Sequence, residues 1–146
     1  MIISNKCIVL IRSRYLKFTL YYLQLYVLNY SKLCSIILGI EPQIRAAFVY
    51  HFNGQLLGGG MRDGIKSYLP PEEITRSTLN TILSWKTREL HSPFLGAGKY
   101  SLTEYEKIKR ITFPLSSSVL LIVGTEIEVD HNAIIKKILQ IIETKP

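Results

Sequence analysis

The side chains that most often do chemistry in proteins are few in this chain and do not group. Histidine occurs at His51, His91 and His131, and no two of these have the HxxxH or HxH spacing of a metal site. The two cysteines, Cys7 and Cys34, are widely separated and lie in apolar surroundings, which favours buried, unreactive thiols. We therefore predict no metal site, no disulfide framework and no oxidising compartment.

Catalysis by a nucleophile needs a serine or cysteine that a histidine activates and an acid orients. The sequence has no GxSxG motif, and the serines at residues 116–118 fit a turn. Two pairs of acids, Glu104 with Glu106 and Glu126 with Glu128, flank strand ends, where we expect exposed carboxylates rather than an acid and base pair. The sequence therefore predicts that the chain is not an enzyme and has no catalytic residues.

A glycine-rich segment at residues 58–67, GGGMRDGIKS, superficially resembles a phosphate-binding P-loop. In a P-loop a lysine directly follows the second glycine and reaches the phosphate oxygens, but Ile65 occupies that position here. Pro70 and Pro71 also separate the segment from the next predicted helix. We predict no nucleotide and no other cofactor, and interpret the glycines as a bulged or closely packed strand end.

Arg62 and Asp63 are the polar residues of this segment that best suit a functional role. They lie where a hairpin strand is expected to leave the sheet, which is a common position for a functional loop. We name them as a candidate interaction loop. The alternative is an exposed turn stabilised by Asp63 and Gly64.

The net charge of +7 is concentrated at one end of the chain. Residues 1–40 carry five basic side chains and no acid, while the other 106 residues carry 13 basic and 11 acidic side chains, which leaves +2. A nearly neutral domain has no evident surface for tracking phosphates. We interpret Lys107, Lys109 and Arg110 as a solvated strand face and predict that the chain does not bind nucleic acid.

Residues 16–40 are apolar almost all round, with basic residues ahead of them. A membrane span needs about 20 such residues, but Gln24, Asn29 and five tyrosines between residues 15 and 30 weaken that interpretation. No short apolar core with a small-residue cleavage site supports a signal peptide. A packed helix is the third interpretation, because apolar residues recur at spacings of 3 and 4: Leu16, Leu20, Leu23, Val27, Tyr30, Cys34 and Ile37.

These alternatives set the expected domain boundaries. Residues 31–146 are predicted to form one domain, and residues 1–30 an apolar, basic extension or helix outside it. The extension is a soluble packed helix, a membrane-associated helix, or upstream sequence that is not native to the domain. The expected location is the cytoplasm, with membrane association as the alternative.

Turn chemistry and periodic patterns predict the elements of the domain. A strand at residues 45–52 runs into Asn53 and Gly54, a favoured two-residue hairpin turn, and should return at residues 55–60. Pro70 and Pro71 open a helix whose apolar stripe includes Ile82 and Trp85. Three strands follow, at residues 99–103, 107–115 and 119–123, and Gly124 should close the last of them.

One predicted helix precedes the first strand and another ends the domain. Residues 31–38 form the first, which Gly39 and Pro42 end. Asp130 is a plausible N-cap for the second, where Ile134 and Ile138 begin an apolar row. The order αββαβββα predicts an α+β fold, with a five-stranded, mostly antiparallel sheet and flanking helices.

That order resembles the roadblock domain of dynein light chains and its profilin-like and PAS-like relatives. Three stretches look like an uncharacterised family of small archaeal proteins of this shape: IEPQIRAAFVYHFNGQLLGGGMRDGIKSYLPPEE, ITFPLSSSVLLIVGTE and VDHNAIIKKIL. The resemblance covers about residues 31–143 and carries no catalytic signature.

Two functions follow from the resemblance. Roadblock-type domains typically dimerise and serve as signalling platforms for small GTPases or other proteins, which implies a homo-oligomer with a regulatory partner. Profilin-like and PAS-like relatives instead hold a ligand against the sheet, which implies a small-ligand sensor, with the N-terminal helix as a membrane attachment. We take the non-enzymatic interaction platform as the leading hypothesis and the sensor as its alternative.

Overall fold

The computed structural model describes residue 17 and residues 29–144, and their elements follow the predicted order with one addition. A first helix covers residues 29–38. It is followed by β1 (Ile44–His51), β2 (Leu56–Met61), α2 (Pro71–Glu89), α3 (Ser92–Leu95), β3 (Ser101–Glu104), β4 (Ile108–Pro114), β5 (Val119–Glu126) and α4 (His131–Glu143). The addition is α3, a single helical turn that was not predicted from the sequence.

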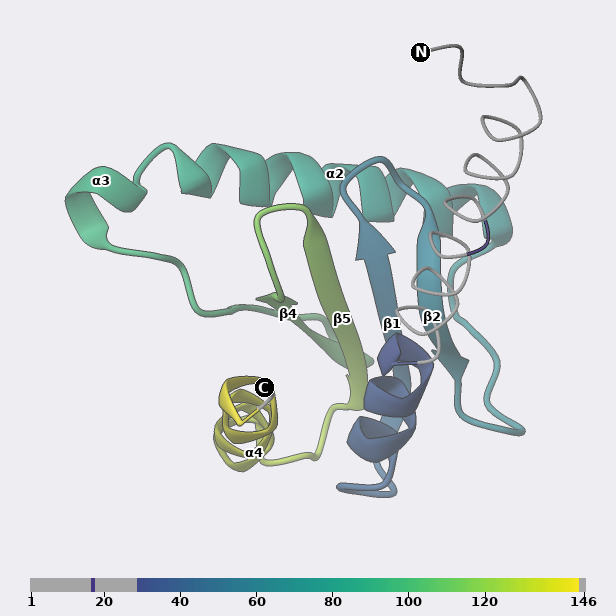
Figure 1. The fold of residues 1–146 in the computed structure, drawn as a ribbon. Coiled ribbons are helices and arrows are strands. Elements are labelled where there is room, and N and C mark those ends of the chain that lie inside the picture. Colours follow the sequence, from purple (N-terminus) through teal and green to yellow (C-terminus); the bar gives the residue numbers. More distant parts are fainter. Residues whose placement is uncertain (1–16, 18–28, 145–146) are drawn as a thin grey trace, which may run out of the picture.

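The five strands form one antiparallel sheet in the order β2-β1-β5-β4-β3. Figure 1 shows α2 above the sheet, and the first helix and α4 below it. We call the side under the first helix and α4 the closed face, and the side under α2 the open face. The predicted α+β class, the five-stranded sheet and the flanking helices are confirmed.

The closed face holds the main hydrophobic core. Strand residues alternate between the two faces, so every second residue of β4 and β5 points into this core. In β1 an irregularity between Ile44 and Ala46 interrupts the alternation, and Ile44, Ala47 and Val49 belong to the core. The first helix adds part of the predicted apolar seam, and α4 adds its isoleucine row. The buried residues are Tyr30, Leu33, Cys34, Ile37, Ile44, Ala47, Val49, Ile111, Phe113, Val119, Leu121, Val123, Val129, Ile134, Ile135 and Ile138. Seam positions before residue 29 lie outside the described residues.

The glycines of β2 allow the first helix to approach the sheet. A Cβ on Gly59 would lie 2.0 Å from the Ala47 carbonyl oxygen and 2.7 Å from the Cys34 sulfur, and Gly59 has a φ of +90°. A Cβ on Gly58 would lie 2.8 Å from the Ser31 backbone nitrogen. The predicted closely packed strand is therefore confirmed, and β2 also contains a bulge opposite Val49.

The β1–β2 hairpin is confirmed, but its turn differs from the prediction. The His51 N–H donates to the Gln55 carbonyl at 2.9 Å, so the loop has three residues. Gly54 has a φ of +91°, whereas Asn53 has no positive φ. The expected two-residue Asn-Gly turn was wrong because one left-handed residue after a tight turn already closes this loop.

The final strand and helix show one correction and one confirmation. β5 continues through Gly124 to Glu126 because Gly124 pairs with both Ala46 and Arg110, so the glycine does not close the strand. The Asp130 carboxylate accepts from the backbone of Asn132 and Ala133 at 3.1 and 3.3 Å, which confirms the N-cap.

No helix in the described part of the chain is long and apolar enough to cross a membrane. The three interpretations of the N-terminal segment concern residues that lie almost wholly outside the described range.

Candidate interaction surface and open-face hollow

Among the described helices, α2 is the one that lies over the open face, and three side chains attach it to the sheet. Thr78, Ile82 and Trp85 are buried, as the predicted stripe requires. The Trp85 indole N–H donates to the Thr112 hydroxyl at 2.8 Å, and that hydroxyl lies 2.8 Å from the Ser101 hydroxyl. This chain of contacts ties α2 to β4 and β3.

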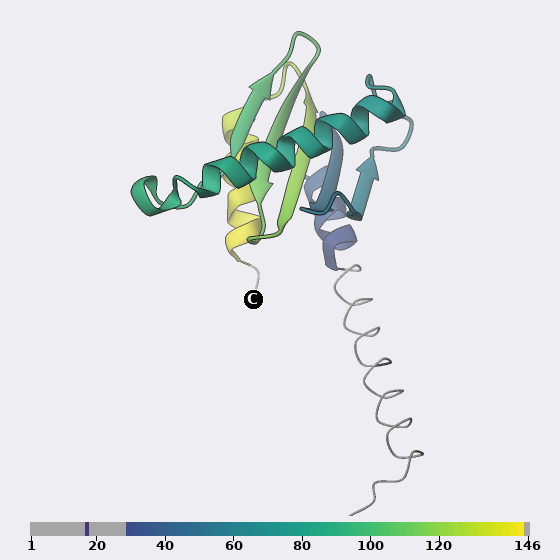
Figure 2. The same cartoon turned by 90° about the horizontal axis from the view of Figure 1, so that it is seen from above.

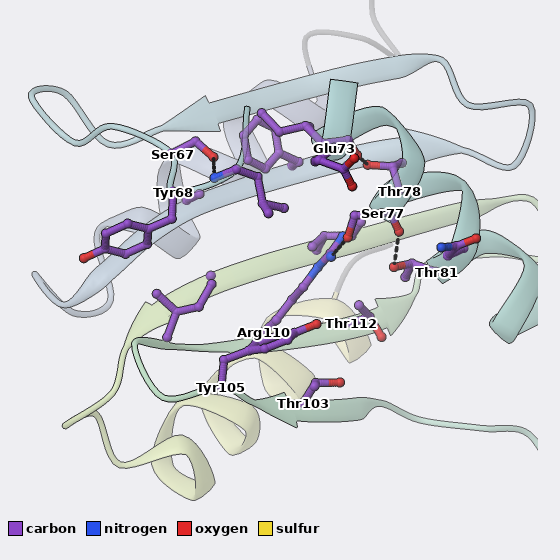
Figure 3. Close-up of a pocket in the computed structure, with 18 of the residues that line it drawn as sticks. Ser67, Tyr68, Glu73, Ser77, Thr78, Thr81, Thr103, Tyr105, Arg110 and Thr112 are labelled. Atoms are coloured by element: carbon purple, nitrogen blue, oxygen red, sulfur yellow. Dashed lines mark hydrogen bonds between the residues drawn. The ribbon is translucent and has the colours of Figure 1, made fainter. Parts of the chain in front are cut away.

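A hollow of about 850 Å³ lies on the open face beside α2. Its floor is formed by side chains of β1, β4 and β5 that point away from the closed face, including Phe48, Ile122 and Thr112. Figure 3 shows Ser77 and Thr81 of α2 on one wall and Tyr105 and Thr103 on another. The hollow therefore opens on a flank of α2 that is rich in hydroxyl groups.

The loop at residues 62–70 forms the remaining wall of the hollow, and Arg45 holds it there. The Arg45 guanidinium pairs with Glu126 at 2.6 Å and donates to the Lys66 carbonyl at 2.9 Å. The same guanidinium lies over the Tyr68 ring, 4.5 Å from its centroid. Glu126 is thus half-buried and ion-paired, which corrects the expectation that it is an exposed acid.

Arg110 points from β4 across the hollow toward α2 (Figure 3). Its guanidinium donates to the Ser77 hydroxyl. Burial lowers the pKa of Arg110 below its ordinary value, against the opposing influence of Tyr105 and Tyr50. Sequence patterns alone did not predict Arg110 as part of a site.

Lys107, Lys109 and Arg110 do not form the expected solvated strand face. Lys109 lies on the closed face with 6% of its surface exposed, and its ammonium donates to the Val129 carbonyl at 2.8 Å. It also lies 3.2 Å from the His131 ring nitrogen Nδ1. The interpretation was wrong because adjacent strand residues point to opposite faces, so Lys109 and Arg110 cannot share one.

The two residues of the candidate interaction loop, Arg62 and Asp63, lie in different surroundings. Arg62 donates to three backbone carbonyls, those of Ile44, Leu38 and Glu41, and so joins β2 to the end of the first helix. Asp63 is exposed in a turn whose next residue, Gly64, has a φ of +77°. Nothing in these contacts tests whether a partner binds the pair, so that role stays a proposal.

Apolar side chains project from α2 and α3 on the flank of α2 that faces away from the hollow. Leu79, Leu83 and Leu90 recur at spacings that set them on one stripe, and Phe94 and Leu95 are 86% and 83% exposed. We call these five residues the outer ridge. Figures 1 and 2 show the end of α2 and α3 extending past the sheet on the β3 side.

Within the described sheet, β3 is an edge strand whose one neighbour is β4. The other edge, β2, packs closely against the first helix through Gly58. An uncovered edge leaves backbone groups available to pair with another chain. α3 and the end of α2, with Leu90, Phe94 and Leu95, lie on the same side of the domain as the β3 edge, whereas Leu79 lies beside Gly54 of the β1–β2 hairpin.

The three histidines lie at the ends of secondary-structure elements. His51 ends β1 and its Nδ1 accepts from the Asn53 N–H at 3.0 Å, His91 precedes α3, and His131 begins α4. No group of three or more His, Cys, Asp or Glu side chains suited to a metal occurs among residues 17 and 29–144.

The structure is similar to solved roadblock domains. A Roadblock/LC7 domain from Streptomyces avermitilis is 12% identical, with a TM-score of 0.59 over 78% of this chain and 92% of that chain. MglB from Myxococcus xanthus is 16% identical, with a TM-score of 0.58 over 78% and 84%. A structure of MglB with tetrameric arrangement is 11% identical, with a TM-score of 0.55 over 79% and 88%.

These similarities define the fold as that of the Roadblock/LC7 and MglB proteins, which confirms the predicted resemblance at the level of fold. No protein-family model and no curated protein matches the sequence. The likeness to small archaeal proteins therefore stays a prediction.

Proposed function

We propose that this chain is a dimerising, non-enzymatic interaction platform of roadblock type that binds a small GTPase or another regulatory protein. The observation that carries the proposal is the outer ridge, whose part on α3 and the end of α2 lies on the same side as the β3 edge strand. Large apolar side chains exposed together on a soluble domain commonly mark a protein interface. One solved relative of the fold, MglB, is described in a tetrameric arrangement, which supports self-association as a property of this fold.

Self-association is tested by light scattering on the full chain over a range of concentrations. We expect the mass to rise from 16.7 kDa toward twice that value. Leu83→Lys puts a charge on the outer ridge and should return the chain to a monomer, because an unpaired charge in an interface costs several kcal/mol. Leu56→Lys is the matched control, since Leu56 is a similarly exposed leucine on the β2 edge. A monomer at every concentration contradicts the proposal.

Partner binding is a separate question. A small GTPase from the same genome, loaded with GDP or with a GTP analogue, should bind the wild-type chain with unequal affinity for the two states. Arg62 and Asp63 are the proposed interaction loop, so Asp63→Lys should weaken this binding and leave the light-scattering mass unchanged. Equal binding of both nucleotide states would argue against a regulatory role.

We further propose that residues 31–146 are the functional domain and that it works in the cytoplasm, with membrane attachment through the N-terminal segment as the alternative. Flotation of the full chain with anionic vesicles separates these locations, because an attached chain rises with the vesicles.

A small-ligand sensor is the second candidate function, and the hollow beside α2 favours it. Its volume of about 850 Å³ falls within the usual range of small-molecule sites, roughly 300–1,000 Å³. A solid open face would have removed this candidate.

A further inference from the structure

Arg110 differs in its partners from two other arginines of the hollow, Arg45 and Arg76. Arg45 pairs with Glu126 at 2.6 Å and Arg76 pairs with Glu73 at 3.0 Å. Among the described residues, no carboxylate lies within 4.0 Å of the Arg110 guanidinium, whose hydrogen-bond partners are the hydroxyl groups of Ser77 and Tyr105. The hollow thus contains a partly buried cation that has only neutral partners.

A cation in this setting is incompletely compensated. Burial disfavours the charged guanidinium, which is why the pKa of Arg110 is lowered. Hydroxyl groups offset part of this cost, whereas a charged oxygen that accepts two N–H bonds offsets much more. A carboxylate or phosphate beside Arg110 would therefore be stabilised by the site as it stands.

The net charge of the residues that line the hollow also favours an anionic ligand. Two of its basic residues are neutralised by Glu126 and Glu73, and the acid that remains is Glu106. The basic residues of the lining without such a pair outnumber it: Arg88, Lys107 and Arg110. The hollow is therefore net positive and suited to an anion.

The aromatic and hydroxyl-bearing residues of the lining indicate what the uncharged part of a ligand should be. Phe48 and Tyr50 lie on the floor with ring centroids 6.0 Å apart, and Tyr68 and Tyr105 line the sides. Aromatic rings bind flat apolar groups, and the hydroxyl groups along α2 can orient polar substituents.

We propose that the hollow binds a small organic anion, with its carboxylate or phosphate group on Arg110 and its flat apolar part against Phe48 and Tyr50. This proposal rests on the sensor function and names the class of its ligand. It is independent of dimer formation, since the outer ridge lies on the other flank of α2.

Trp85 supplies a reporter for the test. It is the single tryptophan of the sequence, and its indole N–H donates to Thr112, a residue of the hollow. A ligand beside Arg110 should therefore shift the one indole N–H signal in a nitrogen-correlated NMR spectrum of the full chain, together with the amide signals of Arg110 and Gly124.

The probes are benzoate, phenyl phosphate and benzamide, the last being a neutral match for benzoate. We expect both anions to shift these signals saturably and benzamide to bind at least about tenfold more weakly, because it lacks the charge. The stronger of the two anions distinguishes a carboxylate from a phosphate ligand.

Arg110→Gln should weaken anion binding at least about tenfold while leaving benzamide binding unchanged. Lys137→Gln is the matched control, because it removes the same charge from an exposed position of α4 and should have no effect. The folded state of Arg110→Gln is checked by its indole signal without probe.

Three results would overturn the proposal. The first is equal affinity for benzoate and benzamide. The second is an equal loss of anion affinity in Arg110→Gln and Lys137→Gln. The third is a set of NMR contacts that place side chains of a second copy in the hollow. Light scattering on the same samples separates this failure from failure of the platform function, because a chain can dimerise without binding anions and bind anions as a monomer.

Discussion

The two faces of one sheet have different packing. On the closed face, two helices cover alternating apolar strand residues, and β2 lacks side chains where the first helix approaches. On the open face, α2 is the one described helix that crosses the strands (Figure 2), and beside it lies a hollow lined by arginines and hydroxyl groups. The difference indicates that the closed face supplies stability and that the open face is available for binding.

The largest loss of stability should come from adding a side chain to β2 where the first helix packs against it. Gly59→Ala would set a Cβ 2.0 Å from the Ala47 carbonyl oxygen at a φ of +90°, so we expect a loss of at least about 4 kcal/mol in the free energy of unfolding. Urea unfolding followed by circular dichroism measures it.

Gly60→Ala is the matched control on the same strand, because nothing lies within 4 Å of its Cβ position. We expect a change within about 0.5 kcal/mol. Similar losses in both variants would mean that β2 is not packed as tightly as described.

The next largest loss of stability should come from replacing Arg62, and its size tells whether this residue has a structural role or an interaction role. Arg62→Met removes donors to three backbone carbonyls and should cost about 2–4 kcal/mol in the free energy of unfolding. Lys66→Met, at an exposed position of the same loop, should cost much less. Unchanged stability in Arg62→Met would leave partner binding as the role of this residue.

A smaller effect tests how α2 is held over the open face. Trp85→Phe removes the indole donor to Thr112 and should cost about 1–2 kcal/mol. A double-mutant cycle with Thr112→Val should give a coupling energy of about 1 kcal/mol between the two residues. Additive losses would show that packing alone attaches the helix.

The smallest effect should come from removing residues 1–28. The described part of the closed-face core begins with Tyr30, so we expect a chain of residues 29–146 to unfold cooperatively with a free energy of unfolding changed by less than about 1 kcal/mol. Loss of the cooperative transition in thermal melts would contradict the proposed domain boundary.

Much of the fold was predictable because local signals determine it. The hairpin, the buried stripe of α2 and the Asp130 cap depend on residues close together in sequence. Position 59 requires glycine because the first helix, which is distant in sequence, packs against it. The sequence alone therefore indicates only that this strand is closely packed.

The site was less predictable for a similar reason. The hollow depends on the path of α2 across the sheet, and the contacts of Arg62 depend on where the first helix ends. The opposite directions of Lys109 and Arg110, by contrast, were available from strand alternation, since Lys109 shares a face with Ile111 and Arg110 with Thr112.

Hydrogen–deuterium exchange of the full chain at low and high protein concentration tests the difference between the faces most directly. The account predicts that concentration increases protection in α2, α3 and β3, while α4 and residues 29–38 stay unchanged. Unchanged protection everywhere, or added protection confined to the closed-face helices, would contradict it.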